Sequence, residues 1–257
     1  MNAAKALGLL RGLETPAFST ADAAARLGLS VEAASQTLRR LVTAGLARSV
    51  RRGLWTIRDP VEALALVEHL TSPYPAYVSL QTALYRHGMI QQIPSVVYVV
   101  SLARSHRIRT SLGLFSVHRI APSFFGGFEV SASSGAKIAT PEKALLDICY
   151  LSAGRSRLFA SLPEVVLPPG FRRSAARAWI AKIPSTRLRT LVARRFEALT
   201  TVAGRPERAP VPQAPAGALS GPKPRVGPSG AKHAEKRRQV RAAGAQAGRP
   251  RSRSDRK

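Results

Sequence analysis

Between residues 20 and 45, the apolar positions recur at the three- and four-residue spacing of two short helices. Thr20 and Ser30 stand at the expected N-caps, because a hydroxyl can accept an unpaired backbone N–H of the first turn. Gly28 separates the two helices, and Gly45 ends the second, as glycine commonly does. The second helix is expected to bury one face, formed by Val31, Ala34, Leu38, Leu41 and Val42.

The residues after the second helix predict a β-hairpin. Residues 46–50 and 54–57 flank Arg51-Arg52-Gly53, a glycine-containing connection with two arginines. Helix, turn, helix and basic hairpin together predict a winged helix-turn-helix domain over residues 1–58. In this motif the second helix enters the major groove of DNA, and its exposed side chains reach the edges of base pairs.

The exposed side of the second helix and the hairpin provide the candidate DNA-binding residues. Gln36 can make a bidentate contact to adenine, and Arg39 to guanine. The hairpin arginines are placed to contact phosphates or the minor groove. The full set of candidates is Ser35, Gln36, Arg39, Arg40, Arg48, Arg51 and Arg52. Two alternatives stay open: a winged helix used for protein contacts, and a helical hairpin with a solvated basic face.

A second domain is predicted over residues 60–203. Asp59-Pro60 marks the boundary, because the residue before a proline disfavours the helical conformation. Strands grouped between helices, without a regular βαβ alternation, predict an α+β fold with an antiparallel sheet. The expected elements are helices at 61–70 and 80–87, strands at 96–102, 114–120 and 128–132, and helices after Thr140, Arg172 and Thr186.

The composition changes at residue 204. Residues 204–257 contain no aromatic residue, 7 Gly and 8 Pro, and their 14 Lys and Arg against 3 acidic residues give a net charge of +11. With so little to bury, we expect this tail to be disordered. Its charge favours a flexible arm that binds DNA or RNA nonspecifically, and a solubilising extension is the alternative.

The whole chain of 257 residues is strongly basic. Lys and Arg number 40 and Asp and Glu 14, which gives a net charge of +26, with +15 on residues 1–203. Such an excess attracts polyanions, so nucleic acid is the first candidate partner and an acidic membrane surface the second. A basic run at Arg104, His106, Arg107 and Arg109 lies between two predicted strands. Its arginines contact the DNA backbone or form a solvated loop.

Other partners and sites have little support in the sequence. No apolar run approaches the roughly 18 residues of a membrane span, and no segment is typical of a signal peptide. The single cysteine, Cys149, is expected to be a small buried hydrophobe and suits a reducing compartment. We therefore expect a cytoplasmic protein that enters no membrane.

The sequence also favours a protein that is not an enzyme. It has no motif for a metal, a cofactor or a catalytic residue. Glu142 and Asp147 could be imagined as a carboxylate pair of a nuclease. Their separation places them about 140° apart on an ideal helix, so that helix cannot aim both at one metal ion.

Three sequence blocks resemble the AbiEi antitoxin family. They are YVSLQTALYRHG at residues 77–88, Gln92-Ile93-Pro94, and TPEKALLD at residues 140–147. The family comprises antitoxins of type IV toxin–antitoxin and abortive-infection systems, which act in phage defence. The resemblance covers about residues 5–200, and the basic tail has no counterpart in the family's usual pattern.

The resemblance implies a transcriptional repressor whose winged helix binds operator repeats of its own operon. It also implies a C-terminal domain needed for antitoxin activity. The partner would be a nucleotidyltransferase-like toxin encoded nearby, opposed without a stable direct complex. Two alternatives from other classes stay open: a nucleic-acid-processing enzyme docked by a winged helix, and a basic nucleoid or RNA-binding protein without sequence choice. The operator and the oligomeric state do not follow from the sequence.

Overall fold

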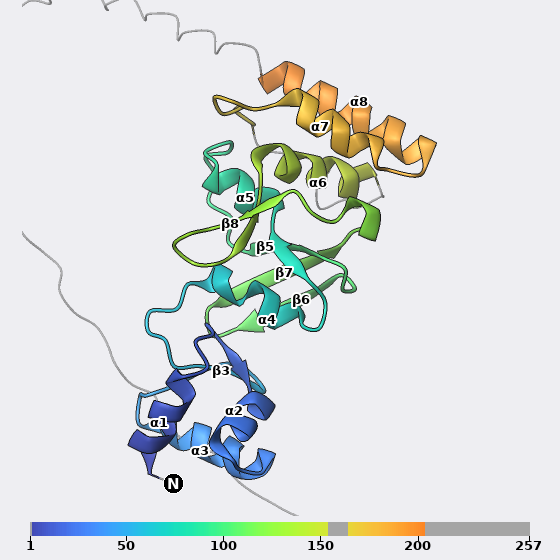
Figure 1. Cartoon of the computed structure of the whole chain (residues 1–257). Helices are drawn as coiled ribbons and strands as arrows, with labels where there is room; N and C mark the ends of the chain where they lie inside the picture. The colour runs from blue at the N-terminus through green and yellow to red at the C-terminus, as the bar shows by residue number, and fades with distance from the viewer. Residues whose placement is uncertain (1, 154–163, 204–257) are drawn as a thin grey trace, which may run out of the picture. The chain divides into compact units, whose positions relative to one another are not determined.

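The computed structural model describes residues 2–153 and 164–203, which form a mixed α and β structure (Figure 1). The predicted disordered tail, residues 204–257, lies outside the described residues. The α-helices are α1 (Ala3–Arg11), α2 (Thr20–Leu27), α3 (Val31–Thr43), α4 (Val67–Thr71), α5 (Leu80–Arg86), α6 (Pro141–Ala153), α7 (Arg173–Ala181) and α8 (Thr186–Ala203). Two 3-10 helices are η1 (Ala63–Leu66) and η2 (Pro122–Phe124). The strands are β1 (Phe18–Ser19), β2 (Arg48–Arg51), β3 (Leu54–Thr56), β4 (Ala76–Val78), β5 (Val97–Ser101), β6 (His106–Thr110), β7 (Gly113–Arg119), β8 (Phe128–Val130) and β9 (Lys137–Ala139).

Residues 2–58, called the N-terminal region below, contain α1 to α3 and a three-stranded antiparallel sheet in the order β1-β3-β2. Its core joins all three helices to the sheet. Leu10, Leu27 and Leu38 are buried there together with Phe18 and Trp55. The predicted boundary at Asp59-Pro60 falls in the connection between β3 and η1.

The start of α2 differs from the prediction by one residue. Ser19, not Thr20, is the N-cap: its hydroxyl accepts from the backbone N–H of Asp22, whose carboxylate accepts from the N–H of Ser19. This reciprocal capping box satisfies two backbone donors at once. Thr20 is free for another contact, and its hydroxyl accepts from the indole N–H of Trp55 at 2.9 Å.

Helix α3 confirms the predicted cap but buries a narrower face than expected. Ser30 is the N-cap, and its hydroxyl accepts from the N–H of Ala33. Ala34, Leu38 and Leu41 are buried. Val31 and Val42 were predicted in the same face but are exposed by 50% and 36%. They lie in the first and last turns, where fewer neighbouring turns cover a side chain.

The second sheet has six strands in the order β6-β7-β5-β4-β9-β8. The predicted antiparallel sheet is confirmed in part: β4–β5, β6–β7 and β8–β9 pair antiparallel, whereas β5–β7 and β4–β9 pair in parallel, so the sheet is mixed. Strand β6 lies between β5 and β7 in the sequence but at the outer edge of the sheet, next to β7. As a result, β7 runs in the same direction as its neighbour β5. Long connections of this kind allow parallel neighbours, which a tight hairpin cannot join.

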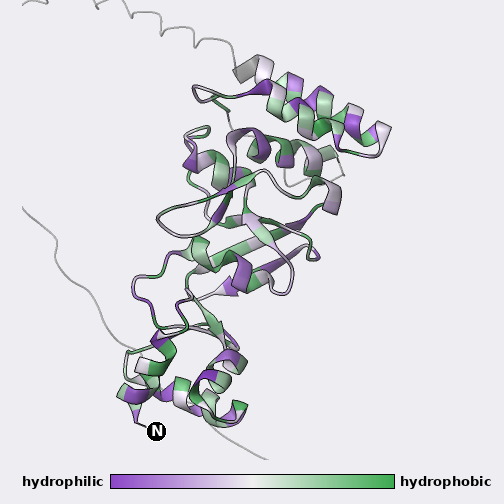
Figure 2. Cartoon of the chain, in the orientation of Figure 1, coloured by the Kyte–Doolittle hydropathy of each residue, from purple (hydrophilic) through white to green (hydrophobic). Residues whose placement is uncertain are grey.

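The six-stranded sheet has a core on each face. On one face, Tyr77 and Val100 pack under residues of α5 to α8. On the other face, Val99 and Phe115 pack with residues of η1 and α4, and Val50 of the N-terminal hairpin joins the same core. Figure 2 shows the apolar colouring of the central strands and the alternation of polar and apolar turns along α8.

Several predicted elements need correction. The helix expected at residues 61–70 is a 3-10 turn, η1, followed by the short α4. Strands β4 and β9, of three residues each, were missed. The basic run was expected between two strands, but three of its residues, His106, Arg107 and Arg109, lie in the edge strand β6, in which only Ile108 is buried. An edge strand with a single buried residue lacks the apolar alternation that identifies a strand.

Candidate nucleic-acid interface

The polar side of α3 is open to solvent. Gln36, Arg39 and Arg40 are exposed, and Ser35 is half-buried. The opposite side is anchored by Leu38 and Leu41 in the core of the N-terminal region. The helix therefore has the two-sided character that a groove-reading helix requires: one side is fixed and the other is accessible to a ligand.

The hairpin β2–β3 stands beside α3 and is fixed to the start of α2. Trp55 of β3 donates its indole N–H to Thr20, and Thr20 donates its backbone N–H to the carbonyl of Gly53 at 3.1 Å. Gly53 has a φ of +77° at the hairpin turn, a conformation that glycine adopts without the steric penalty of a Cβ atom. These bonds hold the hairpin turn against the helix pair.

A surface hollow of about 500 Å³, which we call the α3 hollow, lies between α3 and the hairpin turn. It is lined by Ser35, Gln36 and Arg39 from the helix and by Arg52 from the turn. The structure thus brings together four of the seven residues predicted from the sequence. Glu32 also lines this hollow, so it is not purely basic.

The remaining predicted residues of the N-terminal region do not join this hollow. Arg40 is exposed outside it. Arg48 forms an exposed ion pair with Asp59 at 3.6 Å. Arg51 turns to the other side of the hairpin, where its guanidinium donates to the carbonyl of Leu70 at 3.4 Å. Arg51 is the last residue of β2, whereas Arg52 lies in the hairpin turn, so the two neighbouring side chains have different surroundings.

The predicted backbone-contacting residues are all exposed, but they divide between two places. Arg107 and Arg109 lie on β6, opposite in direction to the buried Ile108. Arg104 precedes that strand and faces a different hollow, described below. The N–H of Ser111, in the turn after β6, donates to the carbonyl of Val50 at 2.9 Å, which ties this hairpin to β2.

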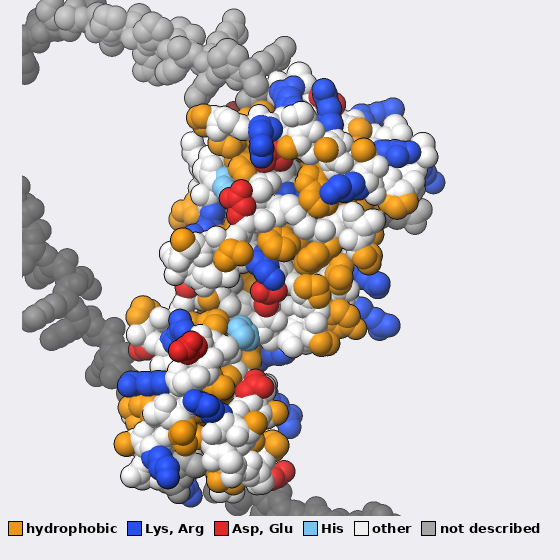
Figure 3. All heavy atoms as spheres, in the orientation of Figure 1, with side chains coloured by type: hydrophobic (Ala, Val, Ile, Leu, Met, Phe, Trp, Pro, Cys, Tyr) orange, Lys and Arg blue, Asp and Glu red, His pale blue; other side chains and the backbone are white. Residues whose placement is uncertain are grey.

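Few of these cations have an acidic partner. Within residues 2–153 and 164–203, the ion pairs engage Arg48, Arg86, Lys137, Lys143 and Arg177. Arg39, Arg52, Arg104, Arg107 and Arg109 pair with none of the described carboxylates. Figure 3 shows Lys and Arg side chains distributed over the visible face with few acidic ones between them. Unpaired surface cations leave their positive potential available to a polyanion.

The sequence reasoning missed a buried polar cluster under α6. Lys143 donates to the carboxylate of Asp147 and to the hydroxyl of Tyr77. Asp147 also accepts from Tyr77 at 3.0 Å and from Ser79 at 2.7 Å. The Lys143 ammonium lies over the ring of Phe124, 4.2 Å from its centroid, a cation–π contact. A lysine and an aspartate four residues apart within an apolar helix were the signal for this pair.

Burial dominates the electrostatics of this cluster. It lowers the pKa of Lys143 and raises the pKa of Asp147, and the attraction between the two groups opposes both shifts. Burial also raises the pKa of Tyr77. All buried polar side-chain atoms of the described residues have a hydrogen-bond partner. Because Lys143 and Asp147 are fully buried, the cluster is closed to a substrate, and its contribution is to the core.

Cys149 and His87 lie outside both the buried polar cluster and the α3 surface. Cys149 is buried as predicted, and burial raises the pKa of its thiol to about 12, which keeps it unreactive. His87 occupies the C-cap of α5, and its Nε2 lies 2.7 Å from the carbonyl oxygen of Ala139 in β9.

Neither a protein-family model nor a curated protein matches this chain. None of the helices in the described part of the chain has both the length and the apolarity to cross a membrane. Across those same residues, no three His, Cys, Asp or Glu side chains are grouped to hold a metal ion.

Proposed function

We propose that this chain is a sequence-specific DNA-binding regulator and that its N-terminal region is a winged helix-turn-helix. Helix α3 would enter the major groove, with Gln36 and Arg39 reading base edges and Arg52 contacting the backbone. The observation that carries the proposal is the α3 hollow, where these polar side chains meet in the open on an anchored helix. Bidentate arginine–guanine and glutamine–adenine contacts are the pairings that such side chains favour.

The resemblance to the AbiEi family supports a more specific proposal. In that case the regulator represses its own operon through operator repeats and acts as the antitoxin of a type IV system in phage defence. The toxin would be a nucleotidyltransferase-like protein encoded nearby. The blocks that carry the resemblance supply Tyr77 and Ser79 from one segment and Lys143 and Asp147 from another, and these four side chains form the buried cluster. We propose no catalytic residue and no cofactor.

DNA binding is tested by selecting duplexes from a random pool with the full chain and measuring affinity for the enriched site. Arg39→Ala should lose about 1 to 3 kcal/mol of specific binding and relax the preference at one base pair. Arg187→Ala removes the same charge from an exposed position on α8 and serves as the control. If no site is enriched, or if both variants lose the same affinity, the chain binds nucleic acid without sequence choice and the proposal is wrong.

Antitoxin activity is tested separately in cells. A neighbouring nucleotidyltransferase-like reading frame should stop growth when expressed alone, and co-expression of the full chain should restore it. Growth arrest that persists despite soluble chain would contradict the antitoxin assignment, while leaving the DNA-binding test unaffected.

A further inference from the structure

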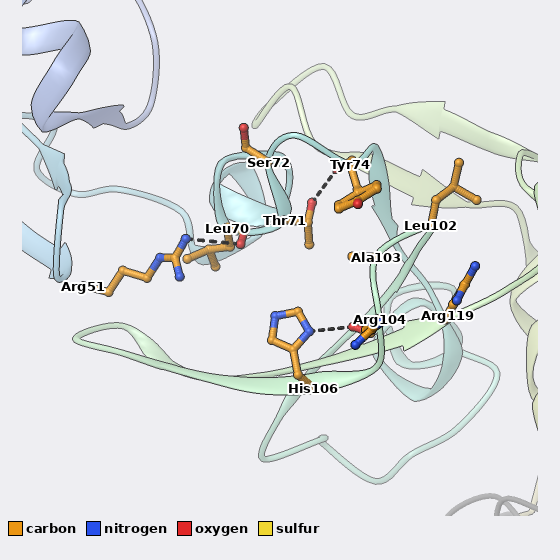
Figure 4. Close-up of a pocket in the computed structure, with 10 residues that line it drawn as sticks. All are labelled: Arg51, Leu70, Thr71, Ser72, Tyr74, Leu102, Ala103, Arg104, His106 and Arg119. Carbon is orange, nitrogen blue, oxygen red and sulfur yellow. Dashed lines mark hydrogen bonds between the residues drawn. The ribbon is translucent and has the colours of Figure 1, made fainter.

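A second hollow, of about 560 Å³, lies on the other side of the hairpin from α3 (Figure 4). It shares no lining residue with the α3 hollow. Its basic lining residues are Arg51, Arg104, His106 and Arg119, and no carboxylate lines it. We call it the basic hollow.

The strand directions explain why these residues converge. Strands β5 and β7 are parallel, so both have their carboxyl ends on the same side of the sheet, which is the edge formed by strand ends. Arg104 follows β5, and Arg119 is the last residue of β7. Strands β4 and β6 each run antiparallel to one of these two, so Tyr74, just before β4, and His106, the first residue of β6, reach the same edge.

The cationic groups of the basic hollow have spare hydrogen-bonding capacity. Arg104 and Arg119 form no side-chain hydrogen bond or ion pair with a described residue, and both are exposed. His106 directs Nδ1 at the carbonyl of Arg104, 2.6 Å away, and since a carbonyl only accepts, Nδ1 carries the proton. This bond leaves Nε2 for a ligand. Arg51 reaches the hollow from the hairpin through its bond to Leu70.

An aromatic ring completes the lining. Tyr74 is 51% exposed, although it lies only three residues after the buried end of α4 at Thr71. Thr71 holds this turn by donating to the carbonyl of Tyr74 at 2.9 Å. Figure 4 shows the Tyr74 ring on one side of the hollow and Arg104 and His106 across from it. An exposed ring beside guanidinium groups is the combination that recognises a base with an attached phosphate.

We propose that the basic hollow is a nucleotide-binding site. Arg104 and Arg119 would hold the phosphates, with Arg51 and His106 adding donors, and Tyr74 would stack on the base. The ligand chemistry is a phosphorylated nucleoside, which a free nucleotide and the 5′ end of a nucleic-acid strand both provide. The proposal goes beyond DNA recognition by α3, because it uses different residues on the other side of the hairpin.

The test is a calorimetric titration of the full chain with ATP at constant ionic strength. Arg119→Ala should weaken ATP binding about 10-fold or more, because it removes a charge-assisted contact. Arg187→Ala is the matched control and should change the affinity less than 2-fold. Equal losses in the two variants would mean that ATP follows net charge only, and this result would overturn the site.

Further titrations define the ligand. Tyr74→Ala should weaken ATP binding at least about 5-fold, and Tyr74→Phe should retain it, since phenylalanine keeps the stacking ring. Adenosine, without phosphate, should bind far more weakly than ATP. If inorganic triphosphate binds as tightly as ATP and the Tyr74 variants do not differ, recognition of a nucleotide is contradicted.

A 5′-phosphorylated single-stranded oligonucleotide separates the two sources of ligand. Tighter binding of the oligonucleotide than of ATP, with the same sensitivity to Arg119→Ala, assigns the site to a strand end, and the reverse order assigns it to a free nucleotide. Arg39→Ala should weaken binding to selected duplexes without changing ATP affinity. Loss of the nucleotide proposal would therefore show in the ATP titrations, and loss of the DNA proposal would show in the duplex titrations.

Discussion

The exposed arginines of the two hollows and the buried lysine of α6 show two opposite uses of positive charge in one protein. Arg39, Arg52, Arg104 and Arg119 have no acidic partner among the described residues. Lys143 is fully buried and has a carboxylate, a hydroxyl and an aromatic face around it. A cation that is already satisfied stabilises the core, whereas an unsatisfied exposed cation is available to an external anion.

This difference predicts opposite mutational effects. Loss of charge in the buried cluster should change stability and leave ligand affinities per folded molecule unchanged. Loss of charge at the hollows should weaken ligand binding and leave the stability of the fold unchanged. Stability measurements and binding measurements on single variants therefore distinguish the two uses of charge.

Asp147→Asn should lower the free energy of unfolding by about 3 to 5 kcal/mol, because it leaves the buried Lys143 without a counter-charge. Urea unfolding followed by circular dichroism measures this loss. The double variant Lys143→Met/Asp147→Leu removes both charges and should be less destabilised than Asp147→Asn alone. Arg187→Ala, on the surface, should stay within about 0.5 kcal/mol of the parent. A double variant that is even less stable than the single variant would contradict the assignment of the cost to the unpaired charge.

His118 provides an intermediate case, since it is partly buried beside a cation. Burial, and then the charge of Arg107, lower the pKa of His118 from 6.5 to about 4. The unfolded chain therefore binds the proton more tightly, so this residue destabilises the fold as pH falls from about 6.5 to about 4 and has no effect above that range.

His118→Gln should remove this part of the pH dependence. The difference in unfolding free energy between the variant and the parent should change by about 1 to 2 kcal/mol between pH 7 and pH 4, after allowance for solvent screening. Stability curves measured by urea unfolding at several pH values test this. His69, whose pKa burial also lowers, is present in both proteins and cancels in the comparison. If the two stability curves are parallel, folding does not lower the pKa of His118, and the prediction is contradicted.

The smallest effect concerns the hairpin arginines, and it depends on the proposed DNA binding. Arg52→Ala should reduce the slope of log affinity against log salt concentration by about 1, as expected for one lost phosphate contact. Arg48→Ala should reduce it less, because Arg48 is already paired with Asp59. Binding titrations on a selected duplex at several salt concentrations give both slopes. A larger change for Arg48 would reverse the roles assigned to these two residues.

Local signals predicted the N-terminal elements well. Ser30, Gly28 and Gly45 each act through the backbone of their own helix end, so the sequence of a few residues determines the outcome. The spacing of Ala34, Leu38 and Leu41 likewise identified the buried face of α3. The exposed side of α3, with Gln36 and Arg39, followed from the same pattern, because it is the side opposite the buried residues.

Features that depend on distant pairing were not predictable in the same way. The parallel pairing of β5 with β7 brings Arg104 and Arg119 to one edge, although 14 residues lie between them in the sequence. Tyr77 and Lys143 are 66 residues apart and meet only because α6 packs across the sheet. A polar residue in an apolar helix indicates a buried partner, but the sequence does not say which distant residue supplies it.

Arg51 and Arg52 are consecutive residues of one hairpin, yet they line two separate hollows. Any ligand that immobilises one of these side chains also restricts the peptide that carries the other. If a nucleotide in one hollow changes the affinity for DNA at the other, thermodynamic reciprocity requires DNA to change the affinity for that nucleotide by the same factor. Binding at the two hollows would then be coupled through this hairpin.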